Sequence, residues 1–236
     1  MFAHRPIIGI AGGIGAGKSH VARLFEQLGC CRVDSDEMVR AAYTHPEVKA
    51  AVLERFGENA FDAAGNVDRK ALAKTVFTDA DARRFLEKLL HPIANKARVE
   101  LMHAAARDER VVAFAWDSPL LFEAGLDRFC DVTVFVDCPR ADRLARVAER
   151  GWDAAELDRR EKAQLPLDKK AALAQYRLAN AASDPATRGR VEPILQAILD
   201  RARPDHACGG AEAPCGPACA CAGAAACASA ASEPAR

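Results

Sequence analysis

The sequence predicts an α/β fold in which parallel strands are joined by helical crossovers. Short runs rich in β-branched residues alternate with amphipathic stretches along residues 1–203. A glycine-rich segment directly follows the first of these runs and leads into an amphipathic stretch. A long stretch of mostly helical pattern separates the second strand-like run from the third. These three observations predict an α/β sheet that carries a helical insertion.

The expected strands are five short apolar runs, whose lengths suit strands better than helices. In chain order they span 7–11, 31–33, 111–116, 132–136 and, as the weakest, 176–179.

The segment between the second and third strands is too long for a single crossover. We therefore expect a helical subdomain over about 37–108, packed beside the sheet. Val48, Val52 and Phe56 share one helical face in this segment. Asp68 and Asp79 stand where helix N-caps are expected.

The composition excludes two kinds of partner. The chain has 236 residues, with 33 Lys and Arg against 33 Asp and Glu, and therefore lacks the basic surplus that drives non-specific binding to nucleic acid. Its longest apolar runs, such as 7–10, fall far short of the roughly 20 residues that span a bilayer. We expect no nucleic-acid and no membrane partner. Because the N-terminus has no signal-peptide pattern, we expect a cytoplasmic chain. The cytoplasm keeps thiols reduced, so we expect its nine cysteines to be free thiols. We also expect the protein to be a monomer or a weak oligomer.

Residues 204–236 contain five of the nine cysteines and no Leu, Ile, Val or aromatic residue. Such a segment cannot bury enough apolar surface to offset the entropy of ordering it. We expect a disordered tail that follows a domain spanning 1–203. A metal site built on Cys215, Cys219 and Cys221 is the weaker alternative, because their spacing contains no C-x₂-C pair.

A phosphate-binding loop is the strongest motif in the sequence. Residues 12–19 read Gly-Gly-Ile-Gly-Ala-Gly-Lys-Ser, a full match to G-x-x-x-x-G-K-[ST] between a strand and a helix. The glycines let successive backbone N–H groups point at phosphate oxygens, and the following helix adds its positive N-terminal dipole. Lys18 supplies a mobile charge, and Ser19 offers a hydroxyl to Mg²⁺. An ordinary glycine-rich turn is the weaker reading, and the dinucleotide pattern G-x-G-x-x-G cannot be aligned on these glycines.

The segments that accompany the loop indicate its class. A GTPase of the common type needs Asp-x-x-Gly after a later strand and Asn-Lys-x-Asp for guanine, and the sequence has neither. A kinase needs a carboxylate near the acceptor hydroxyl and cations over the transferred group. The sequence offers candidates for both.

The carboxylates follow two strands at the sheet edge where open parallel sheets bind ligands. Asp34 and Asp36 follow the second strand, and Asp117 ends the third. One of Asp34 and Asp36 can accept the hydroxyl's proton while the other holds metal-bound water or an arginine. Asp117 occupies a position that commonly holds water around Mg²⁺. Alternatively, each of these carboxylates caps a helix or a turn.

The cations recur later in the chain. Arg143, Arg146 and Arg150 lie at i, i+3 and i+7, which places three guanidinium groups on one helix face. This face can close over the phosphates as a lid, expected at about 140–165. A merely solvated charged face is the alternative.

Together these motifs resemble the dephospho-CoA kinase family. The resemblance runs from about 7 to about 180. It rests on the phosphate loop and on Val-Asp-Ser-Asp at 33–36 with Arg40. It rests further on Phe-Gly at 56–57, Gly-x-Val-Asp-Arg-x-x-Leu at 65–72, Leu-Leu-His-Pro at 89–92 and Asp-Ser-Pro-Leu-Leu-Phe-Glu at 117–123. It implies a P-loop kinase core with a five-stranded parallel sheet, an inserted helical CoA-binding domain and a lid. It also implies transfer of the γ-phosphoryl group of ATP, with Mg²⁺, to the ribose 3′-hydroxyl of dephospho-CoA, the last step of coenzyme A biosynthesis.

The resemblance further implies roles for individual residues. Those expected in catalysis are Lys18, Asp36 as general base, Asp34, Arg146 and Arg150. Those expected to bind ATP are Gly13, Ile14, Gly15, Ala16, Gly17, Lys18, Ser19, His20 and Asn180. Those expected to contact the acceptor substrate are Arg40, His91, Pro119, Leu120 and Glu123. Mg²⁺ is expected on Ser19 and, through water, on Asp117.

Three points stay open in the sequence. Pro92 disfavours helix at the preceding residue, so His91 either belongs to the substrate domain or only marks a helix boundary. Gln175 stands where the family has Asp, and 176–180 is less apolar than usual, which leaves the packing of the fifth strand and the contacts near Asn180 open. The same loop, carboxylates and arginines would also serve a kinase for another small metabolite or a nucleoside monophosphate, or a regulatory protein that binds nucleotide without transfer.

Overall fold

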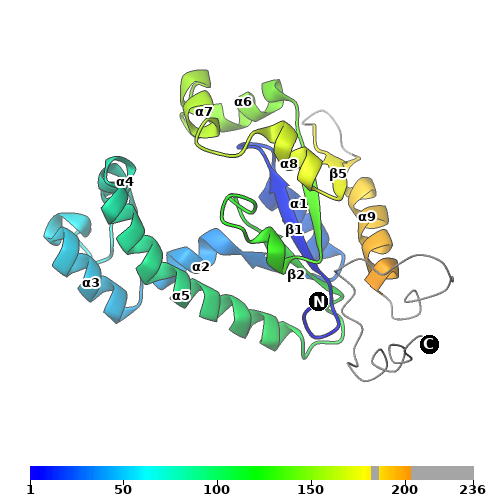
Figure 1. Ribbon diagram of the computed structural model, residues 1–236, viewed down its shortest axis with the longest axis horizontal. Coiled ribbons are helices and arrows are strands. Elements are labelled where there is room, and N and C mark those ends of the chain that lie inside the picture. The colour runs from blue at the N-terminus through cyan, green and yellow to red at the C-terminus, as the bar shows by residue number, and fades with distance from the viewer. Residues whose placement is uncertain (182–185, 203–236) are drawn as a thin grey trace, which may run out of the picture. The chain divides into compact units, whose positions relative to one another are not determined.

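The computed structural model describes residues 1–181 and 186–202. The tail at 204–236, expected to be disordered, lies outside the described residues. In the described part of the chain, five parallel strands form one sheet in the order β2-β3-β1-β4-β5 (Figure 1). The strands are β1 (Ile7–Gly12), β2 (Cys30–Asp34), β3 (Ala113–Asp117), β4 (Val132–Asp137) and β5 (Tyr176–Ala179). The predicted α/β fold and its five strands are confirmed, with small shifts at the strand ends.

Helices connect the strands and cover the sheet. In chain order they are α1 (Lys18–Gln27), α2 (Ser35–Ala42), α3 (Pro46–Phe56), α4 (Arg69–Thr78), α5 (Ala80–Ala105), α6 (Arg140–Ala148), α7 (Ala154–Glu161), α8 (Leu167–Leu173) and α9 (Thr187–Ala202). Short 3₁₀ turns lie at Glu58–Ala60 and Asp127–Phe129. No helix within 1–181 or 186–202 is both long and apolar enough to cross a bilayer.

Both faces of the sheet are buried under helices, as a parallel sheet requires. All six residues of β1 are buried, so its sequence is apolar without alternation. On one face, Phe25 of α1 and Leu195 of α9 pack against the strands. On the other face, Met102 at the end of α5 packs on Phe114, and α8 packs on β1 and β4. This packing fixes the end of β1, from which the phosphate loop emerges.

The helices α2 to α5 form the insertion between β2 and β3. Figure 1 shows α3 and α4 beside the outer half of α5, away from the sheet. They share a hydrophobic cluster of their own, which includes Val48, Val52 and Leu86. The predicted N-caps are confirmed: Asp68 accepts hydrogen bonds from the first turn of α4, and Asp79 from the first turn of α5.

The helix boundary considered for His91 is wrong. α5 continues for 26 residues with Pro92 in its interior. A proline removes one backbone hydrogen bond and crowds the preceding turn, at a cost of about 3 kcal/mol or more. Buried contacts on both sides of the proline, at Leu90 and Met102, hold the helix together across it. His91 is exposed on this helix.

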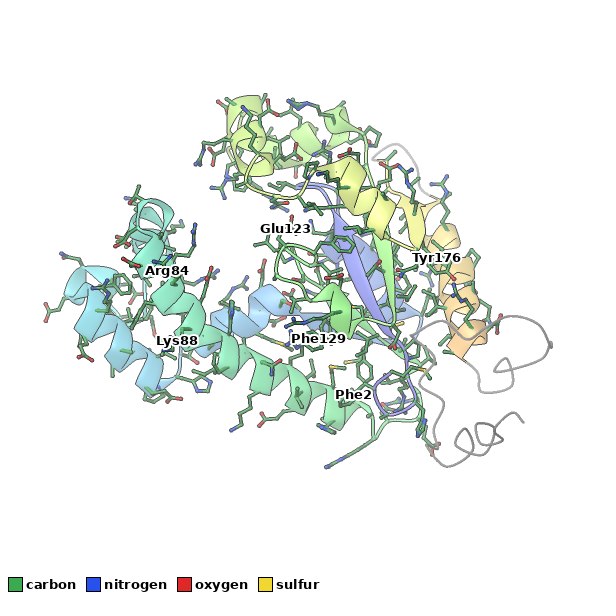
Figure 2. The ribbon with its side chains drawn as sticks, in the orientation of Figure 1. Phe2, Arg84, Lys88, Glu123, Phe129 and Tyr176 are labelled. Carbon is green, nitrogen blue, oxygen red and sulfur yellow. The ribbon has the colours of Figure 1, made fainter. Side chains whose placement is uncertain are left out.

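The fifth strand pairs in parallel with β4, and Leu178 is buried in the main core. Tyr176 packs against the same core from the start of the strand (Figure 2). Gln175 fastens this strand: its Oε1 accepts hydrogen bonds from the backbone N–H and the hydroxyl of Thr133, each at 2.7 Å. The departure from the family's Asp at 175 therefore does not prevent the strand from forming.

Replacing Gln175 with alanine is expected to destabilise the fold by about 1–3 kcal/mol, because the buried N–H and hydroxyl of Thr133 lose their acceptor. Urea unfolding followed by circular dichroism measures this free energy. The matched control is Gln196→Ala on the exposed side of α9, expected to change stability by no more than about 0.5 kcal/mol. An unchanged unfolding midpoint for Gln175→Ala would show that the side chain does not hold the strand.

Candidate active site

The phosphate loop turns sharply between β1 and α1, and two of its glycines are required by both conformation and space. Gly15 and Gly17 have φ of 74° and 88°, in the left-handed region that other residues avoid. A Cβ at Gly15 would lie 2.7 Å from the backbone oxygen of Arg143. A Cβ at Gly17 would lie 2.4 Å from Nδ2 of Asn180. The loop is therefore packed closely against α6 and the end of β5.

Lys18 begins α1, and its side chain folds back over the loop. Its Nζ donates hydrogen bonds to the carbonyl oxygens of Gly12 and Gly13, at 3.2 and 3.0 Å. Burial, together with the nearby charge of Lys170, lowers the pKa of Lys18 to about 8. The opposite effect comes from the carboxylates of Asp117, Asp36 and Glu123. Phosphate oxygens at the loop would offer this ammonium stronger partners than the two carbonyls.

Asp117 is buried at the end of β3, in register with Asp34 at the end of β2. Burial raises the pKa of Asp117, while a hydrogen bond from the hydroxyl of Ser19 acts to lower it. The Asp34 carboxylate accepts a hydrogen bond from the N–H of Glu37 at 3.0 Å and forms an ion pair with Arg32. The helix-cap alternative therefore holds for Asp34, which caps α2.

Asp36 lies in the first turn of α2 and borders the same cleft as Asp34 and Asp117. Partial burial raises its pKa, and the carboxylates of Asp34 and Asp117 raise it further. The guanidinium groups of Arg69 and Arg40 oppose this shift. A carboxylate with a raised pKa beside two cations is suited to accept a proton from a substrate hydroxyl.

A cleft of about 950 Å³ joins these groups. It is large enough for an extended ligand, and its walls carry more basic than acidic side chains. The basic residues are Lys18, His20, Arg23, Arg40, Arg146, Arg150, Arg159 and Arg160, and the acidic ones are Asp34, Asp36, Asp117 and Glu149. Such a cleft favours a ligand that bears several negative charges.

Arg146 ties α6 to the phosphate loop. Its guanidinium donates to the carbonyl oxygens of Gly15 and Ala16, at 3.2 and 3.0 Å, and to that of Asn180 at 3.2 Å. Asn180 is buried, and its Nδ2 donates to the oxygen of Ala16 at 2.7 Å. Arg146 and Asn180, which follow the phosphate loop far along the chain, therefore hold its backbone by hydrogen bonds.

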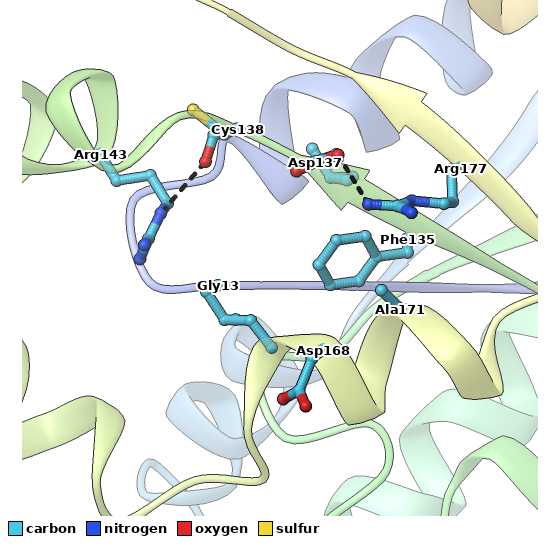
Figure 3. A pocket seen from close by; sticks show the side chains of 10 residues that line it. Gly13, Phe135, Asp137, Cys138, Arg143, Asp168, Ala171 and Arg177 are labelled. Atoms are coloured by element: carbon cyan, nitrogen blue, oxygen red, sulfur yellow. Dashed lines mark hydrogen bonds and ion pairs between the residues drawn. The ribbon is translucent and has the colours of Figure 1, made fainter.

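Arg143 does not share the exposed face expected for it. It is buried, forms an ion pair with Glu161 and donates to the carbonyl oxygen of Cys138 at 3.3 Å. Figure 3 shows this bond at the rim of a small cavity of about 120 Å³ behind Gly13, where an ion pair joins Asp137 and Arg177. Arg143 thus joins α6 to α7 and also donates to the carbonyl oxygen of Ile14 in the phosphate loop at 3.5 Å, without lining the large cleft. Of the three arginines that the spacing predicts on one face, Arg146 and Arg150 both line the large cleft, although Arg150 lies just beyond the end of α6.

Comparison with known proteins identifies the family. The family model described as dephospho-CoA kinase matches residues 6–185. A curated dephospho-CoA kinase of Anaeromyxobacter dehalogenans is 39% identical over 191 residues, which cover 80% of this chain and 90% of the relative. The chain belongs to the dephospho-CoA kinase family. It is accordingly an ATP-dependent kinase, a transferase with a nucleotide-binding P-loop fold.

Solved structures agree with this fold. The crystal structure of TT1252 from Thermus thermophilus matches with a TM-score of 0.68 and 33% identity, covering 84% of this chain and 98% of that one. A dephospho-CoA kinase from Campylobacter jejuni matches with a TM-score of 0.56 and 20% identity, covering 83% and 98%. Membership of the dephospho-CoA kinase family also separates the chain from the regulatory nucleotide-binding proteins that the sequence left open.

The structure brings most residues predicted for a dephospho-CoA kinase site to one cleft. Those that line it are Ile14, Gly15, Gly17, Lys18, Ser19, His20, Asp34, Asp36, Arg40, Asp117, Pro119, Leu120, Arg146, Arg150 and Asn180. Gly13 and Ala16 belong to the loop but are buried. They do not line the cleft, and neither do two further predicted residues: His91 is exposed on α5, and Glu123 forms an ion pair with Lys170 at 2.7 Å.

Several cleft residues were missed in the sequence. Arg159 and Arg160 lie on α7, and Arg160 stacks on the ring of Trp152 with its guanidinium carbon 4.0 Å from the ring centroid. The adjacent arginines within the expected lid could have indicated these positions. Arg23 and Gln164 gave no such signal, because isolated polar residues in amphipathic stretches usually face solvent.

Proposed function

We propose that this enzyme transfers the γ-phosphoryl group of ATP to the ribose 3′-hydroxyl of dephospho-CoA, which completes coenzyme A. One observation carries the proposal: a full phosphate loop shares a basic cleft with Asp36 and Asp117, next to the helical insertion. The curated relative from Anaeromyxobacter dehalogenans is named dephospho-CoA kinase, which supports this choice of acceptor.

Catalysis in this proposal is mainly positioning and electrostatics. The acceptor oxygen forms a bond to the γ-phosphorus as the bond from that phosphorus to the β-phosphate oxygen breaks. The hydroxyl proton passes late to the carboxylate of Asp36. Lys18 exchanges the carbonyls of Gly12 and Gly13 for phosphate oxygens, and Arg150 adds positive charge from the lid. These cations spread the charge that develops on the transferred group.

The residues present fit a magnesium ion bound together with ATP. Within the described ranges, no group of three or more His, Cys, Asp or Glu side chains is arranged to hold a metal ion. Mg²⁺ suits such a site, because it is usually held by one or two protein oxygens, several waters and substrate phosphates. Ser19 and, through water, Asp117 would hold it, and their side chains are already joined by a hydrogen bond. When bound, Mg²⁺ would neutralise charge on the β- and γ-phosphate oxygens.

The acceptor is proposed to lie between the helical insertion and the loop that follows β3. Arg40, Pro119 and Leu120 line the cleft there, and Leu120 is an exposed apolar side chain. Segment 140–165 would close over the phosphates and exclude water, which otherwise competes as acceptor. Contacts of His91 and Glu123 with the acceptor remain predictions.

The acceptor is tested with purified full-length protein, MgATP and separate reactions with dephospho-CoA, AMP, CMP and pantetheine derivatives. Product masses are read by mass spectrometry. We expect only dephospho-CoA to gain one phosphoryl group at a substantial rate. Faster phosphorylation of AMP or CMP would overturn the acceptor assignment while leaving the kinase fold intact.

We further propose that the enzyme works in the cytoplasm, as a monomer or weak oligomer, without nucleic-acid or membrane partners. The four cysteines of the described residues are free thiols, at Cys30, Cys31, Cys130 and Cys138, as suits a reducing compartment. Light scattering coupled to size-exclusion chromatography measures the oligomeric state.

A further inference from the structure

Lys170 on α8 is a buried charge that lies outside the cleft. Its residue surface is 1% exposed, the lowest value among the buried charged residues of the described chain. Its Nζ lies 2.7 Å from Oε1 of Glu123 and 2.9 Å from Oε1 of Gln164. Buried lysines are rare unless they are paired in this way, so the site is built around this ammonium.

Glu123 extends the contact to a third segment. Its Oε1 also accepts the backbone N–H of Leu165, at 3.0 Å. Glu123 belongs to the loop that follows β3 (Figure 2), and Gln164 and Leu165 belong to the connection from α7 to α8. The carboxylate and the ammonium therefore join the loop after β3 to the connection from α7 to α8 and to α8 itself, with Glu123 and Leu165 separated by 42 residues in the sequence.

The loop after β3 and the connection from α7 to α8 both supply walls of the active-site cleft. The loop after β3 contributes Pro119 and Leu120, directly after Asp117. The connection from α7 to α8 contributes Ala163 and Gln164. Neither Glu123 nor Lys170 lines the cleft, so their pairing affects the cleft through the segments that it joins.

We propose that Lys170 is a positioning residue for phosphoryl transfer, which holds the lid connection at Gln164–Leu165 against the loop carrying Pro119 and Leu120. Its charge also acts on Lys18, which places the junction close to the phosphate loop. Small displacements of positioned groups lower turnover strongly, because the reacting atoms must meet in line. The effect is expected on turnover more than on ATP binding, since the loop's own hydrogen bonds do not involve Lys170.

The test compares Lys170→Met with Lys170→Arg, which keeps the charge, and with Lys169→Met, the exposed neighbour on the same helix. We expect Lys170→Met to lower kcat by about tenfold or more at a temperature where it stays folded, with ATP affinity by calorimetry within about threefold. Lys170→Arg should retain more turnover than Lys170→Met, and Lys169→Met should match the unaltered protein.

A second variant separates positioning from stability. Lys170→Met combined with Glu123→Gln removes both charges but keeps an acceptor for the N–H of Leu165. We expect its melting temperature to rise above that of Lys170→Met while kcat stays low. Recovery of kcat together with the melting temperature would overturn the proposal, as would a Lys170→Met kcat within about threefold of the unaltered protein.

This inference rests on the proposed function only for its readout. Turnover is measured with whichever acceptor of the panel the unaltered protein phosphorylates fastest. Failure of dephospho-CoA as acceptor would thus overturn the proposed function while leaving this test decisive for Lys170.

Discussion

Replacing Lys18 with alanine is expected to lower turnover by about 10²- to 10³-fold or more, with a smaller effect on ATP affinity. The ammonium is held near the loop by the carbonyls of Gly12 and Gly13 and is free to follow the γ-phosphoryl group as charge moves onto it. Its largest contribution therefore belongs to the transition state rather than to the bound nucleotide. Steady-state kinetics with dephospho-CoA and calorimetry with ATP measure the two effects separately.

The control for this variant is Lys88→Ala on α5, an exposed lysine of the helical insertion (Figure 2). It removes the same group outside the cleft and should leave turnover within about twofold. A Lys18→Ala enzyme with turnover close to the unaltered protein would contradict the catalytic role given to the phosphate loop.

Replacing Asp36 with asparagine is expected to abolish most phosphoryl transfer while dephospho-CoA still binds. Asparagine keeps the shape of the side chain but cannot accept the proton, and general-base catalysis contributes about 10²- to 10⁴-fold. Asp34→Asn is the comparison, because an asparagine at 34 can still cap α2. We expect the loss to be clearly larger at Asp36, and equal losses in both variants would contradict its assignment as the base.

The pH dependence gives an independent check on Asp36. Partial burial and the neighbouring carboxylates raise its pKa above the ordinary value of 3.8. The base must be ionised to accept a proton, so kcat/KM should fall as the pH drops through this raised pKa. An acidic limb that persists unchanged in Asp36→Asn would assign the titration to another group.

The predictable parts of the site follow from a contiguous motif and from a general rule of parallel sheets. The phosphate loop is a contiguous motif whose strand and helix flank it in the sequence, so residues 12–19 identify it directly. Asp34 and Asp117 could be placed together because carboxyl ends of parallel strands meet at one sheet edge, and they are paired in register.

The parts that were not predictable depend on contacts between distant segments. Arg143 fits the expected arginine face by spacing, but its partner Glu161 lies on the next helix, and the pair turns the side chain inward. The sequence around Lys170 is typical of a solvent-exposed lysine, because its partner Glu123 belongs to the distant loop after β3. Pro92 signals a helix end locally, and buried packing along α5 overrides that signal. A single sequence does not reveal which distant segments these side chains contact.

The fate of the γ-phosphoryl group tests the central claim most directly. ATP labelled with ¹⁸O on its γ-phosphoryl group is incubated with dephospho-CoA and the full-length enzyme. Mass spectrometry then follows the label, and phosphorus NMR locates the new phosphate. We predict that the labelled phosphoryl group appears on the ribose 3′-oxygen of the product. Label released mainly as inorganic phosphate, or attached at another position of the acceptor, would contradict the proposed transfer.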